Sequence, residues 1–112
     1  MSHGTVRLVD FLESEKDTWK EDPLKSISQS IIQYYQGYAP PKKSDDPDSL
    51  RWTGKDRLAH CMWMLSEIVN NGEISITRKH RWFGYVQAVL IEIGGITVAE
   101  FRDLTRNVFN GD

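Results

Sequence analysis

Cysteine is almost absent from this sequence, since Cys61 is the single one. A lone thiol excludes an intramolecular disulfide and fits a reducing compartment. No apolar run approaches the roughly 20 residues that a membrane-spanning helix needs. The first ten residues are polar and mixed, unlike the apolar stretch of a secretory signal. We therefore expect a cytoplasmic protein that does not use a membrane.

Catalytic and metal-binding patterns are also missing. The chain has no C-x-x-C, no H-E-x-x-H, no G-x-S-x-G and no glycine-rich phosphate loop. His60 and Cys61 are adjacent, so on a helix their side chains point about 100° apart and make a poor pair of metal ligands. His60 could act as a general base, but no nucleophile lies at a diagnostic spacing. We predict no catalytic residue, no metal site, no cofactor and no enzymatic activity.

Residues Thr77–Ile93 form the most apolar stretch of the 112-residue chain. After the basic residues at its start, only Gln87 and Glu92 are strongly polar. A helix that is apolar on nearly every side is expected to be buried on nearly every side. The pattern therefore predicts a central helix over about 77–93, with the other elements packed around it.

Four other segments complete the predicted fold. Residues 22–38 and 53–71 follow a helical period of apolar residues, and 98–110 follows a capping pattern at Thr97 and Glu100. Residues 5–20 fit a helix or a strand, and their length favours a helix. The proline-rich stretch at about 39–50 predicts a long loop. The sequence thus predicts an all-α single domain over 1–112, with four to five helices.

A basic cluster opens the central segment. Arg78, Lys79 and Arg81 stand beside Trp82, a combination of cations and an aromatic plane that suits phosphate and base contacts. The positive end of the helix dipole lies at the same place, so an anionic partner would stabilise the cluster. The alternative is that the acidic residues of the N-terminal segment neutralise it within the fold. The net charge of −2 gives nucleic acid binding no overall support.

Tyrosines form a second candidate surface. Tyr34, Tyr35 and Tyr38 cannot all face inward from one helix, and they precede the proline-rich loop. Exposed tyrosines of this kind are typical of protein interfaces. The equally weighted alternative is that their rings are buried and their hydroxyl groups remain in water.

The stretch Arg78–Leu104 resembles a pattern found in small uncharacterised phage and prophage proteins. That pattern is H-R-W-x-G-x-x-Q-x-x-L, a glycine turn, and then T/S-x-x-E-x-R. It maps onto His80, Arg81, Trp82, Gly84, Gln87 and Leu90, followed by Gly95, Thr97, Glu100 and Arg102. The resemblance implies a phage-encoded protein in a bacterial cytoplasm, and it carries no activity.

The resemblance leads to an expectation about function. Small phage proteins commonly bind and inhibit one host protein, including CRISPR and other defence components. We expect a host or phage protein as the partner, bound through Arg78, Lys79, Arg81 and the three tyrosines, and self-association is compatible with the same surfaces. The alternative is a nucleic-acid-binding protein that uses the basic residues at 78–82.

Overall fold

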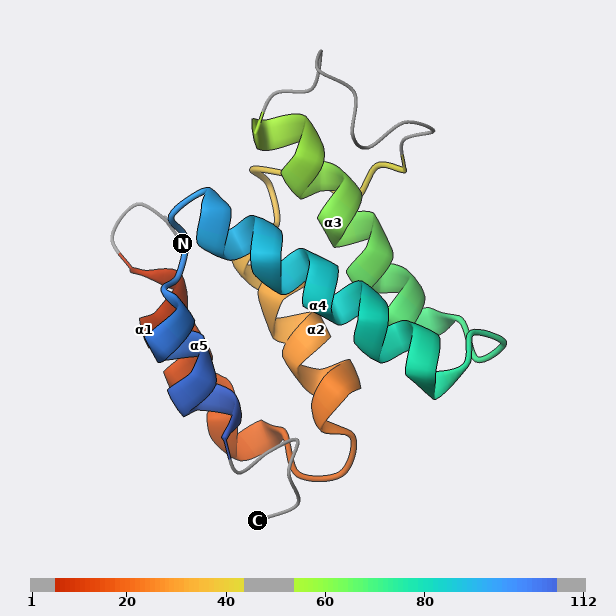
Figure 1. Ribbon diagram of the computed structural model, residues 1–112, viewed down its shortest axis with the longest axis horizontal. Coiled ribbons are helices and arrows are strands. Elements are labelled where there is room, and N and C mark those ends of the chain that lie inside the picture. Colours follow the sequence, from red (N-terminus) through yellow and green to blue (C-terminus); the bar gives the residue numbers. More distant parts are fainter. Residues whose placement is uncertain (1–5, 44–53, 107–112) are drawn as a thin grey trace.

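The structure, a computed structural model, describes residues 6–43 and 54–106 (Figure 1). Within these ranges the chain forms helices and no β-strand. The elements are α1 (Leu8–Glu15), the short 3-10 helix η2 (Lys16–Thr18), α2 (Pro23–Tyr35), α3 (Gly54–Asn70), α4 (Ile76–Glu92) and α5 (Val98–Thr105). This confirms the predicted all-α fold, and it shows that the first segment is helical rather than extended.

The start of α2 follows directly from its sequence. The Asp22 side chain accepts a hydrogen bond from the N–H of Lys25 at 3.2 Å, and Pro23 occupies the first helical position, where its missing N–H costs nothing. The helix ends at Tyr35 rather than at Tyr38 as we predicted. Gly37 follows with a φ of +90°, a conformation that glycine adopts without steric cost.

Hydroxyl caps begin the two C-terminal helices. Ser75 accepts a hydrogen bond from the N–H of Arg78, so α4 begins at Ile76. Thr97 and Glu100 form the predicted capping box at the start of α5. The predicted loop residues 44–50 and the predicted helix residues 53 and 107–110 lie outside the described residues.

Four helix pairings organise the bundle (Figure 1). Helix α3 packs along both α2 and α4, while α1 packs against α2 and lies beside α5. Among the described residues, no helix is long and apolar enough to cross a membrane. Helix α3 packs against both α2 and α4, whereas α4 packs mainly against α3. Helix α3 therefore has more extensive helical contacts than α4.

The burial of α4 corrects the prediction that it is covered on nearly every side. Its core face consists of Phe83, Val86, Val89 and Leu90, and these four side chains are buried. Ala88 on the same helix is exposed. The helix is amphipathic, and its remaining apolar side chains lie at the edge of the core instead of inside it.

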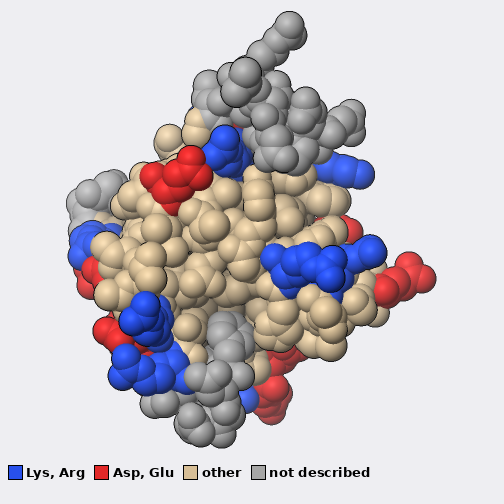
Figure 2. Space-filling view, viewed as in Figure 1, with Lys and Arg blue, Asp and Glu red and all other residues tan. Residues whose placement is uncertain are grey.

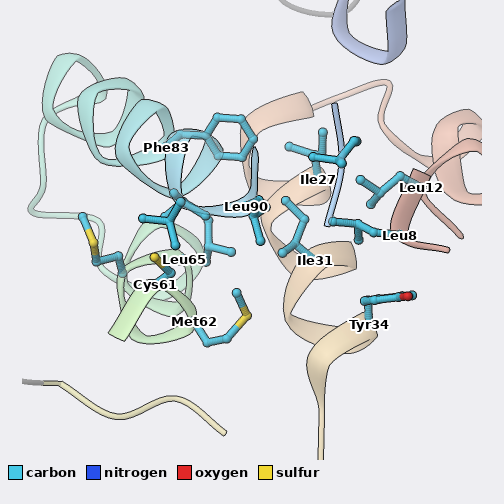
Figure 3. Packing of buried hydrophobic residues seen from close by; sticks show 14 of the residues in the cluster. Leu8, Leu12, Ile27, Ile31, Tyr34, Cys61, Met62, Leu65, Phe83 and Leu90 are labelled. Atoms are coloured by element: carbon cyan, nitrogen blue, oxygen red, sulfur yellow. The ribbon is translucent and has the colours of Figure 1, made fainter. Parts of the chain in front are cut away.

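The core includes side chains from all five described α-helices, and Figure 3 shows part of it. Leu8 and Leu12 from α1 meet Ile27 and Ile31 from α2, and the sulfur-containing side chains of α3 lie on the other side with Leu90. Burying this contiguous apolar surface is the main term that stabilises the fold. It also fixes the positions of the ends of α2, α3 and α4, where the candidate sites lie.

Candidate functional site

The first turns of α4 carry the predicted basic residues. Arg78 and Arg81 are exposed and Lys79 is half-buried. Residues three apart on a helix share a face, so Arg78 and Arg81 point to the same side and Lys79 is displaced from it. Figure 2 shows a group of basic side chains over the N-terminal half of α4. We call Arg78, Lys79 and Arg81 the basic patch.

The basic patch has no acidic partner among residues 6–43 and 54–106. Ion pairs in this part of the chain join Arg7 to Glu100, Lys16 to Glu13, Arg57 to Glu92 and Arg106 to Asp103. The acidic residues of α1 therefore do not neutralise the patch, which was the alternative to a binding role. The positive end of the α4 dipole adds to the same field. The patch is available to an anionic group.

An exposed apolar side chain stands beside the patch. Ile76, the first residue of α4, is 62% exposed. Its side chain and the cations of the next turn belong to one short stretch of helix. This mixture of apolar and cationic groups is typical of a surface that contacts another protein.

Trp82 contacts a tryptophan of α3 instead of standing apart beside the basic patch. Its ring lies against the ring of Trp63 on α3, with centroids 5.8 Å apart. Trp63 in turn stacks on His60 at 5.6 Å, and the Lys43 ammonium lies 5.3 Å from the Trp63 ring centroid. A hydrogen bond from the Lys42 N–H to the Ala59 carbonyl holds the segment that contains Lys42 and Lys43 along α3. Trp82 therefore closes the α3–α4 contact.

His60 and Cys61 are buried among packed side chains of the core. His60 is 7% exposed and stacked on Trp63, and Cys61 is fully buried. Burial raises the pKa of the Cys61 thiol to about 12, so the reactive thiolate is suppressed. In the part of the chain that the structure describes, no three histidine, cysteine or acidic side chains are grouped as metal ligands.

The three tyrosines have three different environments. Tyr34 is buried, and its hydroxyl group donates a hydrogen bond to the Val6 carbonyl. Tyr35 is half-buried, and Tyr38 is 54% exposed. Tyr34 is thus a core residue, which corrects its assignment to an exposed tyrosine surface. The two others remain accessible because α2 ends at Tyr35 and the chain turns at Gly37.

Tyr35 and Tyr38 lie at a hollow that the sequence did not indicate. It has a volume of about 450 Å³ and lies where the end of α2, the start of α3 and the turn after α4 meet. Its other walls include Lys55, Leu58, Ile93 and the Gly94–Gly95 turn. The exposed tyrosines and the double glycine were visible in the sequence, but their proximity depends on tertiary packing. We call this site the tyrosine hollow.

The basic patch and the tyrosine hollow lie at opposite ends of α4. Arg78 is in the first turn, and Ile93 follows the last helical residue. At a rise of about 1.5 Å per residue, these positions are roughly 22 Å apart along the helix axis. The structure therefore does not join the predicted site residues into one surface.

Comparisons with family models, with curated proteins and with solved structures found no match to this chain.

Proposed function

We propose that this protein binds an acidic surface of another protein through the basic patch. The observation that carries the proposal is that Arg78 and Arg81 are exposed, share one helix face and make no ion pair among the described residues. Exposed Ile76 lies three positions before Lys79 and so shares a helix face with that residue of the patch. Charge complementarity of this kind accelerates association and selects the partner.

The resemblance of Arg78–Leu104 to small phage proteins supports a more specific form of the proposal. In this form the protein is phage-encoded, acts in a bacterial cytoplasm, and inhibits a host or defence component by binding it. No catalytic group is required, because occupying the partner's surface is sufficient. Self-association through the same patch would need an acidic surface on a second copy.

Nucleic acid is the alternative anionic partner. Three cations within one turn suit phosphate groups. Two observations favour a protein instead. The ring of Trp82 packs against Trp63 at the contact between α3 and α4, and the net charge of −2 gives nucleic acid binding no overall support.

The test uses the tagged full chain as bait in bacterial lysate, with and without nuclease. We expect a bound protein that survives nuclease treatment and is lost when Arg78→Glu and Arg81→Glu are combined. Circular dichroism should show unchanged helicity in this variant, because negative charge in the first turn suits the helix dipole. A matched reversal of two exposed cations elsewhere, Lys20→Glu with Lys25→Glu, should retain the partner.

Two results would contradict the proposal. If nuclease abolishes capture, the partner is nucleic acid, and binding should then weaken steeply with salt. If the folded variant of Arg78 and Arg81 captures its partner as well as the parent does, the basic patch is a solvated helix start and the binding surface lies elsewhere.

A further inference from the structure

The tyrosine hollow contains a phenol hydroxyl without a hydrogen-bond partner among the described residues and an ammonium group without a carboxylate partner there. In the described part of the chain, no side chain or backbone group forms a hydrogen bond with the Tyr35 hydroxyl. Lys55 has no carboxylate within ion-pair distance there, and its ammonium group lies 5.0 Å from the centre of the Tyr38 ring. A phenol donor and a cation therefore border the same hollow.

The absence of a side chain at Gly95 leaves room for the Tyr35 hydroxyl group. A Cβ atom at Gly95 would lie 2.9 Å from this hydroxyl oxygen and 3.3 Å from the Leu90 carbonyl oxygen. Any side chain here would push the phenol away from the turn. Gly94 reverses the chain direction with a φ of +82°, which glycine adopts without strain. The double glycine thus shapes the wall against which the phenol rests.

Two of the remaining lining residues, Leu58 and Ile93, have aliphatic side chains. Leu58 from α3 is buried at the base of the hollow, whereas Ile93 after α4 is 41% exposed. Exposed Tyr38 forms part of the rim. An apolar ligand would shield Ile93 and Tyr38 from water, which the hydrophobic effect favours. A volume of about 450 Å³ is within the range of small-molecule sites.

We propose that the tyrosine hollow binds a small carboxylate with an aromatic or aliphatic body. The Lys55 ammonium and the Tyr35 hydroxyl hold the carboxylate, and Leu58 and Ile93 contact the body. A tyrosine hydroxyl is protonated at neutral pH, and burial raises the pKa of Tyr35 further, to about 12. The phenol therefore donates to a carboxylate and does not repel it. This inference does not depend on the basic patch.

The test uses 3-phenylpropionate as the probe and its neutral amide, 3-phenylpropionamide, as the matched control. Titration of the ¹⁵N-labelled full chain should give saturable chemical-shift changes near Tyr38, Lys55 and Gly94. A ligand of this size is expected to bind with a Kd on the order of 1 mM. The amide should bind about fivefold to tenfold more weakly, because it lacks the charge that Lys55 attracts.

Two variants test the proposed contacts of the carboxylate with Lys55 and with Tyr35. Lys55→Gln keeps most of the side chain and should reduce the affinity for the acid to that for the amide. Tyr35→Phe keeps the ring and should weaken the acid about threefold, which is typical of one lost hydrogen bond. Lys25→Gln, at the opposite end of α2, should change nothing.

Three results would overturn the proposal. The first is that the shifts do not saturate up to about 20 mM of the acid. The second is that the acid and the amide bind with equal affinity. The third is that Lys55→Gln binds the acid as tightly as the parent does. None of these results bears on the partner capture that tests the basic patch, so the two proposals fail separately.

Discussion

Arg7 and Glu100, which are 93 residues apart, form an ion pair at 3.0 Å between the start of α1 and the first turn of α5. The same carboxylate accepts a hydrogen bond from the Thr97 N–H and so closes the capping box of α5. One side chain therefore both begins a helix and attaches it to the helix beside it.

The Glu100 carboxylate should make stability depend on pH. The Thr97 backbone N–H, followed by Arg7, lowers the pKa of this carboxyl from its ordinary value of 4.5. A group with a lowered folded-state pKa stabilises the fold above its unfolded-state pKa, and the contribution is lost as pH falls through the folded-state value. Urea unfolding of Glu100→Gln between about pH 5 and pH 3 should show a shallower loss of stability than the parent shows.

The control for that measurement is Glu73→Gln, at an exposed residue that makes no ion pair within the described residues. Its stability should follow the parent's pH dependence. If the curve for Glu100→Gln superimposes on the parent's, the link between α1 and α5 contributes no pH dependence.

Two serines on α2 should respond in opposite ways to replacement by alanine. The Ser28 hydroxyl is fully buried and has no hydrogen-bond partner among the described residues, whereas Ser30 accepts from the Trp19 indole and donates to the Ser26 carbonyl. An unpaired buried polar group costs about 1–3 kcal/mol. Ser28→Ala should therefore leave the free energy of unfolding unchanged or raise it by about 1 kcal/mol. Ser30→Ala should lower it by about the same amount.

Chemical denaturation of both variants checks this prediction, with each serving as the control for the other. A clear loss of stability in Ser28→Ala would mean that its hydroxyl is hydrogen-bonded in solution.

The one-sided burial of α4 predicts a sharp contrast between two positions on that helix. Val86 is fully buried and Ala88 is exposed. Val86→Asp would place a carboxylate in the core and should cost more than about 4 kcal/mol, a large part of the roughly 5–15 kcal/mol that stabilises a typical domain. Ala88→Asp should cost about 1 kcal/mol or less, mainly through helix propensity. Thermal melts followed by circular dichroism distinguish them, and equal melting temperatures would show that the core face of α4 is misassigned.

Cys61 should report on global opening. Its thiol is fully buried with a raised pKa, so a thiol reagent at about pH 8 should label the native protein only when the core opens. Addition of urea should accelerate labelling in parallel with unfolding. Fast labelling without denaturant would indicate that α3 separates easily from its neighbours.

Local rules account for much of what the sequence predicted. The caps at Asp22 and Thr97 involve residues only three positions apart, so sequence spacing alone identifies them. Periodicity located α2 and α3 in the same way, and the long apolar stretch at 77–93 located α4. The end of α2 was harder to predict, because the turn at Gly37 removes Tyr38 from the helix face that buries Tyr34.

Tertiary placement accounts for what the sequence did not predict. The apolar residues of α4 indicate how much of its surface is unfavourable in water. They do not indicate how many neighbouring helices are available to cover that surface. Likewise, the basic patch is local and was found from spacing, whereas the tyrosine hollow joins residues from α2, α3 and the turn after α4. Its lining could not be listed before those three elements were placed.

The separation of the basic patch and the tyrosine hollow along α4 has a consequence for how their energies combine. Sites more than about 7–10 Å apart without shared partners usually contribute independently. A small ligand in the hollow should therefore leave capture through Arg78 and Arg81 unchanged, and a double-mutant cycle between Lys55 and Arg81 should give a coupling free energy near zero. A measurable coupling would mean that α4 transmits a displacement from one end to the other, or that a single large partner covers both.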